Sequence, residues 1–596
     1  MIKHFILVVL TVLLYSQAWS YSPVARVNCV PYQHVENGTT FKLGVVAFSK
    51  PGISAGGGGS ISVAVTPSSG SYTGTNPLTT STMALNSRTE TWEYFVVVDS
   101  SDFSVNTLVD FDITVTDDDS NTRVLSNFYL YVDGASDITP AYEAWVDIEG
   151  SDGSGTLDSS GDPYISIASA ISAIETANGN SDNCVIYLVG DTYSFSGLTP
   201  TTDNEWLEIT AASGASKENV IVNTGVLVTD YLKVSGITLQ SQGSNQSVIN
   251  DDTQDDYKWV DDCRLIGSGR YTSLSNPVHH NNILLYHTDN YIYDVSNAVG
   301  WCLLARNITI DKVGNDAFFN TLFVINSTVT DISKGETENH SDVYQVSTGT
   351  NAANPNYTPP SNRIIYNLKA TDVKCQGFFS TFEEHPTGVA QDNAIVNMIV
   401  EMRNDCECCG DFTAFVLGGY EWDHLLLWNN TFPYGTGSST GIPTNSSIIG
   451  NVFWQFLASS LDWSANGNSE GNTVLHNHYM NIYGETPACT PSSADTYQSK
   501  ACPRPNSNAP DSGATQTYSS GDAGLDMTPA SGAFLYPENG SPLINGLSSV
   551  LVPVDNANDE RGSTSDIGAY EYTSGTNIGT GVIGAVGVGV TVNISD

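Results

Sequence analysis

The sequence predicts an all-β protein with two parts, a small antiparallel β-sandwich followed by a parallel β-helix. The main observation is a set of partial repeats in which two or three apolar residues run into an asparagine. Where the spacing is tightest, a unit is about two dozen residues long, as expected when each repeat is one coil stacked on its neighbours. Strands rich in Val, Ile, Leu and Phe, broken by Asn, Gly, Ser and Asp, indicate β-coils. The repeats are 324–326, 364–367, 426–429, 448–451 and 474–477.

Residues 1–20 are predicted to be a secretory signal peptide. Lys3 and His4 precede an apolar run at 5–15, and Ala18 and Ser20 provide small residues at a cleavage site. The run is shorter than the roughly 20 residues that span a bilayer, and no later segment supplies such a span. We therefore expect a secreted or cell-surface protein that is not transmembrane.

The chain is strongly acidic, with a formal net charge of -43 from 64 acidic and 21 basic residues. Such a field repels nucleic acids and anionic membrane surfaces, so the sequence argues against both as partners. Acidity says less about the substrate, because it suits solubility and Ca²⁺ loading equally well.

Ten cysteines in an exported chain favour disulfides. Cys489 and Cys502 flank one loop and are predicted to form a local disulfide. Cys406, Cys408 and Cys409 have no histidine at ligand spacing, so disulfides to other coils are favoured over a metal site.

Residues 21–135 alternate apolar and polar positions, as at 111–115 and 128–132, with turn residues between the strands. This pattern predicts the sandwich. The segment 109–132 resembles the last hairpin of immunoglobulin-like or cadherin-like domains. Its acidic turn, Asp117 to Asp119, suits either Ca²⁺ or a plain hairpin, and the hairpin is favoured.

Residues 142–572 are assigned to the β-helix. Ile167, Ala170, Ile171 and Ile174 share one face of a predicted helix, which would cover the open end of the first coil. From Trp145 this stretch resembles the entry segment of secreted right-handed parallel β-helix proteins, and 541–546 with 566–572 resembles their closing segment. The resemblance implies a right-handed coil with a long groove. That group includes polysaccharide lyases, glycoside hydrolases, epimerases and adhesins, so it does not define an activity.

Residues 573–596 alternate Gly and Val and are predicted to form a flexible tether that ends in one edge-adding strand. Such a tail suits attachment to a cell surface or self-association.

Asp316, Asp342 and Asp411 precede comparable turns in their coils. Stacked coils place equivalent side chains about 4.8 Å apart, so these carboxylates are expected to form one file. Carboxylates that close raise one another's pKa or recruit a cation, which makes the three residues candidate Ca²⁺ ligands.

The densest polar cluster surrounds Asp342, and Gln345 is its candidate substrate-binding residue. The candidate catalytic residues are Lys334, His340, Asp342, Glu383 and Glu384. In β-elimination, Ca²⁺ or a protonated side chain would neutralise a uronate while Lys334 or His340 removes the ring proton. In hydrolysis, two of the three acids would act as general acid and base. The scarcity of Lys and Arg favours hydrolysis, and the structural alternative is that Asp342 bonds turn amides.

Trp422 and Trp463 each lie beside an aspartate and are expected to be exposed and to stack on sugar rings, whereas Trp428 and Trp454 are expected to fill the core. The functional hypothesis is an exported protein that binds, and as a lyase or hydrolase cleaves, an extracellular polysaccharide. The alternative is a non-catalytic adhesin or stalk, with the sandwich as spacer and the tail as tether.

Overall fold

The computed structural model describes most of residues 21–572. The described residues are 21–125, 127–134, 140–151, 155–178, 183–195, 205–224, 231–241, 257–267, 285–333, 341–347, 361–381, 389–402, 413–417, 421–439, 443–458, 473–475, 477–480, 517–519, 525, 536–539, 541, 543–545, 547, 551–557, 559–561 and 565–572. The predicted signal peptide and the Gly/Val tail lie outside the described residues.

The N-terminal part consists of two packed sheets. One sheet has the order β1 (Val24–Val27), β3 (Thr40–Phe48), β7 (Thr91–Asp99) and β6 (Met83–Asn86). The other has the order β2 (Gln33–Glu36), β10 (Phe128–Asp133), β8 (Thr107–Thr116), β4 (Ser60–Pro67) and β5 (Leu78–Thr80), with β9 (Thr122–Val124) beside β8 and the 3₁₀ turn η1 (Ser100–Asp102) between β7 and β8.

The core of the sandwich comes from the alternation that the sequence showed. Phe111, Ile113 and Val115 point inward from β8 and are fully buried against Val45 and Val96 of the other sheet. The topology differs from the prediction in one respect, because β2 pairs with β10 in parallel. The predicted likeness to immunoglobulin domains remains a prediction.

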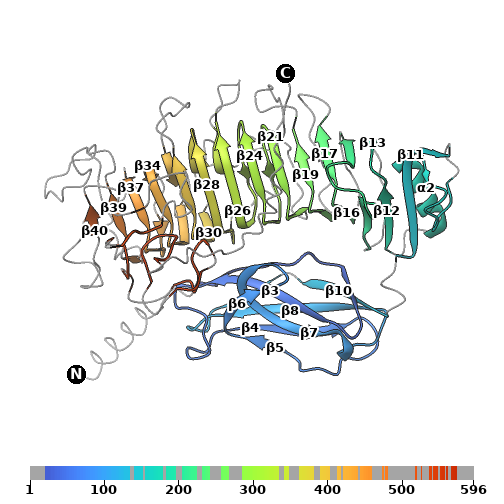
Figure 1. Ribbon diagram of the computed structural model, residues 1–596. Coiled ribbons are helices and arrows are strands. Elements are labelled where there is room, and N and C mark those ends of the chain that lie inside the picture. Colours follow the sequence, from blue (N-terminus) through green and yellow to red (C-terminus); the bar gives the residue numbers. More distant parts are fainter. Residues whose placement is uncertain are drawn as a thin grey trace, which may run out of the picture.

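The second part is a parallel β-helix, as predicted, and it makes the protein all-β. Its strands stack in three rows, called here the first, second and third face (Figure 1). The first face holds β11 (Tyr142–Ser151), β12 (Cys184–Leu188), β14 (Leu207–Ala211), β16 (Leu232–Ser235), β18 (Lys258–Asp261), β20 (Leu285–Thr288), β23 (Leu304–Arg306), β26 (Phe323–Ile332), β28 (Ile364–Val373), β30 (Val389–Val396), β33 (Glu421–Trp428), β36 (Ser447–Ile449) and β38 (Thr473–Leu475).

The second face holds β13 (Thr192–Phe195), β15 (Ile221–Thr224), β17 (Thr238–Ser241), β19 (Arg264–Ile266), β21 (Tyr291–Val295), β24 (Thr309–Val313), the second halves of β26 and β28, β31 (Ile399–Met402), β34 (Thr431–Ser439), β37 (Val452–Ala458), β39 (His478–Met480) and β40 (Thr517–Ser519). The third face holds β22 (Val299–Gly300), β25 (Phe318–Phe319), β27 (Asp342–Ser347), β29 (Gln376–Thr381) and β32 (Thr413–Leu417), which pairs with β34; β35 (Pro443–Thr444) pairs with β33.

The asparagine repeats lie at the corner between the first and second faces. Asn326, Asn367 and Asn429 turn the chain there with φ of 48°, 56° and 54°, a left-handed conformation that asparagine adopts more readily than most residues. In the later coil Gly450 takes that position with φ 71°, so Asn451 comes one residue later. The Asn451 side chain accepts a hydrogen bond of 3.0 Å from the backbone N–H of Asn430 and thereby ties one coil to the next.

The predicted capping helix is confirmed as α2 (Ile167–Asn178). Ser166 begins it, because its Oγ accepts a bond of 3.1 Å from the backbone N–H of Ser169. Ile167, Ala170 and Ile171 are buried in the core of the β-helix, so the helix covers the first coil.

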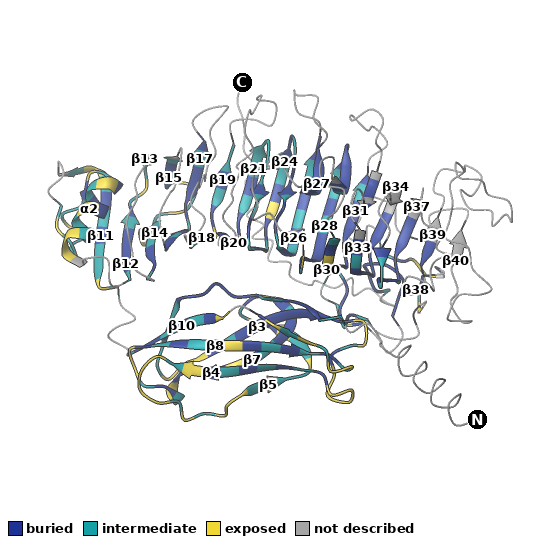
Figure 2. Cartoon of the chain, turned by 180° about the vertical axis from the view of Figure 1, so that it is seen from behind, coloured by how far each residue is buried: buried dark blue, intermediate teal, exposed yellow. Residues whose placement is uncertain are grey.

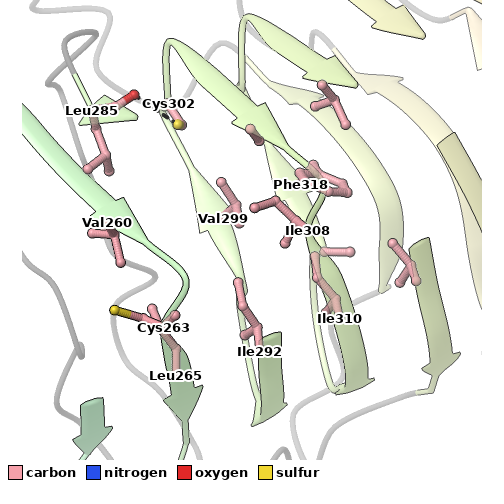
Figure 3. Close-up of a cluster of buried hydrophobic side chains, with 14 of the residues drawn as sticks. Val260, Cys263, Leu265, Leu285, Ile292, Val299, Cys302, Ile308, Ile310 and Phe318 are labelled. Carbon is pink, nitrogen blue, oxygen red and sulfur yellow. Dashed lines mark hydrogen bonds between the residues drawn. The ribbon is translucent and has the colours of Figure 1, made fainter. Parts of the chain in front are cut away.

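The interior of the β-helix is apolar and continuous through the coils. Figure 3 shows this core around Val260, Leu265 and Ile292. Further along, one internal file is aromatic, with Tyr344 and Phe378 stacked at 5.5 Å between ring centroids. Stacked coils thus bury equivalent side chains against each other.

The sandwich lies along the side of the β-helix and covers its first face (Figures 1 and 2). Phe48 of β3 contacts Tyr366 and Trp428 across the boundary, with ring centroids 5.3 Å and 6.2 Å away. The buried residues that share this cluster are Val24, Val30, Tyr32, Val46 and Phe48 of the sandwich and Trp206, Tyr231, Tyr286, Leu304, Phe323, Ile325, Ile364, Tyr366, Ala394, Val396, Leu426, Trp428, Val552 and Val554 of the β-helix part. The sandwich therefore packs beside the β-helix, and it is not placed end to end with it as a spacer would be.

The described parts of 536–572 pack against the corner at Asn397. The Asn397 side chain donates to Val554 O at 3.0 Å, and the backbone N–H of Ala569 donates to Thr431 Oγ1 at 2.9 Å. Arg561 is buried and donates to the carbonyl oxygens of Val554 and Gly568, each at 3.0 Å. The segment that resembles a closing segment therefore lies against the side of the late coils.

Among the described cysteines, Cys29, Cys263 and Cys302 are free and buried, and Cys184 is also buried; the sequence favoured disulfides for an exported chain, and the three free cysteines do not form them. They lie among apolar side chains, and burial raises the pKa of Cys263 to about 12, so its thiol stays protonated. Cys375 is disulfide-bonded. The other five cysteines, and with them the predicted Cys489–Cys502 pair, lie outside the described residues.

Candidate functional site

The strands β25, β27 and β29 carry the predicted carboxylate file. Phe318 pairs with Tyr344, which places Asp316 beside Asp342, and Asp342 pairs with Gln376. The structure thus brings Asp316 and Asp342 together. Asp411 lies outside the described residues, and the register places Thr413 beside Gln376, because Phe378 pairs with Phe415.

Both aspartates are shielded from solvent, Asp316 at 3 % and Asp342 at 0 % exposure. Burial raises the pKa of Asp316 well above its usual value, and the adjacent charge of Asp342 raises it further. A hydrogen bond joins the two carboxyl groups. Two buried carboxyls in contact cannot both ionise at neutral pH, so the pair holds a shared proton.

The described residues contain no group of three or more His, Cys, Asp or Glu that could hold a metal ion. Asp316, Asp342 and Gln376 offer only part of the six to eight oxygen ligands that Ca²⁺ takes. In the acidic turn of the sandwich, Asp117 accepts from Asn121 N at 2.8 Å, and Asp118 accepts from Ser54 N at 2.7 Å. The Asp117 carboxylate is thus bound by its own turn, and the Asp118 carboxylate by the loop at 54–59.

Gln345 lies on the outer side of the same strands. Its neighbours Tyr344 and Val346 are in the core, so the partly exposed Gln345 side chain faces outward. Phe319 and Phe379 pair with it on either side and are also partly exposed.

Trp301 extends this row, with its ring edge-on to Phe319 at 5.8 Å. We call Trp301, Phe319, Gln345 and Phe379 the Gln345 row. Sequence reasoning found Gln345 and missed its aromatic neighbours, because two adjacent phenylalanines read as core. The signal was the alternation itself, since Phe318 and Phe378 take the inward positions.

The predicted catalytic residues Lys334, His340, Glu383 and Glu384 lie outside the described residues, as does Trp463.

Trp422 was expected to be exposed, and this was wrong. It is 1 % exposed, pairs with buried Ala390, and lies edge-on to Phe378 at 6.3 Å in the core. The acidic neighbour misled the prediction, because Asp423 takes the opposite side of β33. Trp428 is buried as expected, but against the sandwich and not inside the coils.

No family model matches the chain, and neither the curated proteins nor the solved structures contain a significant match. None of the described helices is long and apolar enough to cross a membrane.

Proposed function

We propose that this is an exported protein that binds an extracellular polysaccharide along the outer surface of its β-helix. The Gln345 row carries the proposal. Phenylalanine and tryptophan rings pack on the apolar faces of sugar rings, and a side-chain amide both donates to and accepts from sugar hydroxyls. An aromatic, an amide and a second aromatic follow one another at the roughly 4.8 Å spacing of stacked strands.

The arrangement of the two parts supports the same proposal. The sandwich covers the first face with a continuous apolar cluster, so a glycan is directed to the second and third faces. The second face repeats through successive coils, and the third face repeats from β22 to β32, so both offer stacked strands to an extended chain.

The test is binding of a panel of polysaccharides to the purified mature protein by isothermal titration calorimetry. The Phe319→Ala/Phe379→Ala variant should bind the selected glycan at least tenfold more weakly, since each aromatic contact contributes about 1 kcal/mol. Phe95→Ala is the matched control, because Phe95 is a partly exposed phenylalanine of the sandwich. Equal affinity of the double variant and the wild type would contradict the proposal, as would the absence of binding to any glycan.

Glycoside hydrolysis is a second candidate, favoured by the shared proton of Asp316 and Asp342. A carboxyl group that stays protonated at neutral pH is what a general acid of this chemistry requires. Asp342 lies three residues before Gln345 on one strand, so the two side chains take opposite sides of that strand. Because both carboxyls are buried, hydrolysis requires a local opening that lets the glycan reach them.

Asp342→Asn separates the two candidates. For a hydrolase it abolishes release of reducing sugar and leaves glycan binding intact. Release at the wild-type rate by the variant would exclude this role for Asp342.

A further inference from the structure

The second face carries a stacked aromatic pair apart from the Gln345 row. Tyr291 and Tyr293 flank the core residue Ile292 on β21, so both side chains project outward. Their rings are parallel to within 19°, with centroids 6.3 Å apart, and both are partly exposed. Within the described ranges, neither ring belongs to the apolar core or to the cluster shared with the sandwich.

Polar groups surround the pair at fixed positions. Lys312 Nζ lies 4.6 Å from the centroid of the Tyr293 ring and donates a hydrogen bond to its hydroxyl. Asp311 pairs with Tyr293 on the next strand and hydrogen-bonds the Tyr291 hydroxyl. On the other side Arg264 pairs with Tyr291. We call Arg264, Tyr291, Tyr293, Asp311 and Lys312 the tyrosine platform.

The platform and the Gln345 row belong to neighbouring positions on one coil. The chain runs from β21 through the corner at 296–298 into β22, and Trp301 of the Gln345 row follows directly. Val299 pairs with Phe318 in the next coil, so Phe319 lies beside this corner as well. A glycan bound on the third face can therefore extend around the corner onto the second.

Charge selects the kind of sugar. The basic groups of the platform have acidic neighbours, since Arg264 lies 4.0 Å from Glu218 and Lys312 is adjacent to Asp311. The whole chain carries a formal charge of -43, which repels a polyanion over long range. Donors and acceptors beside flat rings, without net positive charge, match hydroxyl groups better than carboxylate or sulfate groups.

We propose that the tyrosine platform binds successive sugar rings of a neutral polysaccharide. This rests on the proposed function and names both a second binding surface and the substrate class. Each tyrosine ring packs under one sugar, while Arg264, Asp311 and Lys312 bond its hydroxyls.

The experiment compares neutral and acidic glycans on the full mature chain. Oligosaccharides of β-glucan, mannan and galactan serve as neutral probes, and oligosaccharides of alginate and pectate serve as acidic probes. The variants are Tyr291→Ala/Tyr293→Ala, which removes the rings, and Tyr291→Phe/Tyr293→Phe, which keeps them. Tyr187→Ala is the control, because Tyr187 is a partly exposed tyrosine of the first face whose ring lies beside that of Trp145, with centroids 5.1 Å apart.

We expect a neutral glycan to bind, and the double alanine variant to weaken it at least tenfold. The double phenylalanine variant should stay within about threefold of the wild type, since stacking is retained, and Tyr187→Ala should bind normally. If a neutral glycan binds equally well to the double alanine variant but not to the Phe319/Phe379 variant, the platform is refuted and the proposed function stands. Preference for alginate or pectate refutes the neutral class. Failure of every probe refutes the proposed function, and the platform with it.

Discussion

Removing Phe48 tests whether the sandwich and the β-helix form one packed body. Phe48 ends β3, is 3 % exposed, and contacts Tyr366 and Trp428 of the first face. Truncation of a buried phenylalanine to alanine lowers the free energy of unfolding by about 3–5 kcal/mol, because the burial of the ring is lost and a cavity is left in its place. The two edge-to-face ring contacts account for about 1–3 kcal/mol of this loss.

The assay is urea denaturation followed by tryptophan fluorescence, under conditions in which unfolding is reversible. Trp206 and Trp428 lie in the shared cluster and report on it directly. Phe48→Ala should lower the free energy of unfolding by about 3–5 kcal/mol. Val124→Ala should change it by less than about 0.5 kcal/mol, since Val124 is 71 % exposed. A loss below about 1 kcal/mol for Phe48→Ala would show that the docked arrangement is wrong.

Three further predictions concern the interior. Asn451→Ala should destabilise the protein by about 2–5 kcal/mol, measured by urea denaturation, because it removes the acceptor of two Asn430 N–H groups and leaves them buried; a loss below about 1 kcal/mol would contradict the proposed tie between these coils. Burial raises the pKa of Asp316, so the folded state holds a proton that the unfolded state releases; this stability is complete below about pH 4 and is lost as the pH rises through the raised pKa. Asp316→Asn should therefore reduce the decline of melting temperature with pH, and an unchanged slope would contradict the shared proton. Burial likewise raises the pKa of Asp555 from 3.8 to about 6. The free energy of unfolding should therefore fall by about 3 kcal/mol as the pH rises from about 4 to about 6, and Asp555→Asn should remove that part of its pH dependence.

The architecture was predictable because each coil repeats a local signal. Apolar runs that end in asparagine mark a strand and its left-handed corner, and the helical spacing from Ile167 to Ile174 marks the cap. The docked sandwich was not predictable from the same patterns. Tyr366 and Trp428 lie in strands that are buried on both faces, and such strands show no alternation that separates the inside of the coil from the outside.

The candidate site was predictable only in part, because the length of each coil varies. Ala305 pairs with Val324, whereas Val324 pairs with Ile365, so inserted segments change the count between equivalent positions. Asp316 and Asp342 were aligned correctly, but two coils later the equivalent position belongs to Thr413. Burial of the aspartate pair depends on how the coils and connecting segments pack, and no spacing in the sequence encodes it.

Hydrogen–deuterium exchange with and without a bound neutral oligosaccharide tests the central claim most directly, since it maps the contacted backbone on the wild-type protein. We predict slower exchange in Tyr291–Val295, Phe318–Phe319 and Asp342–Ser347, which carry the tyrosine platform and the Gln345 row. Exchange in the sandwich and in the covered strands Leu304–Arg306 and Glu421–Trp428 should not change. Protection confined to the sandwich or to the first face would contradict the account.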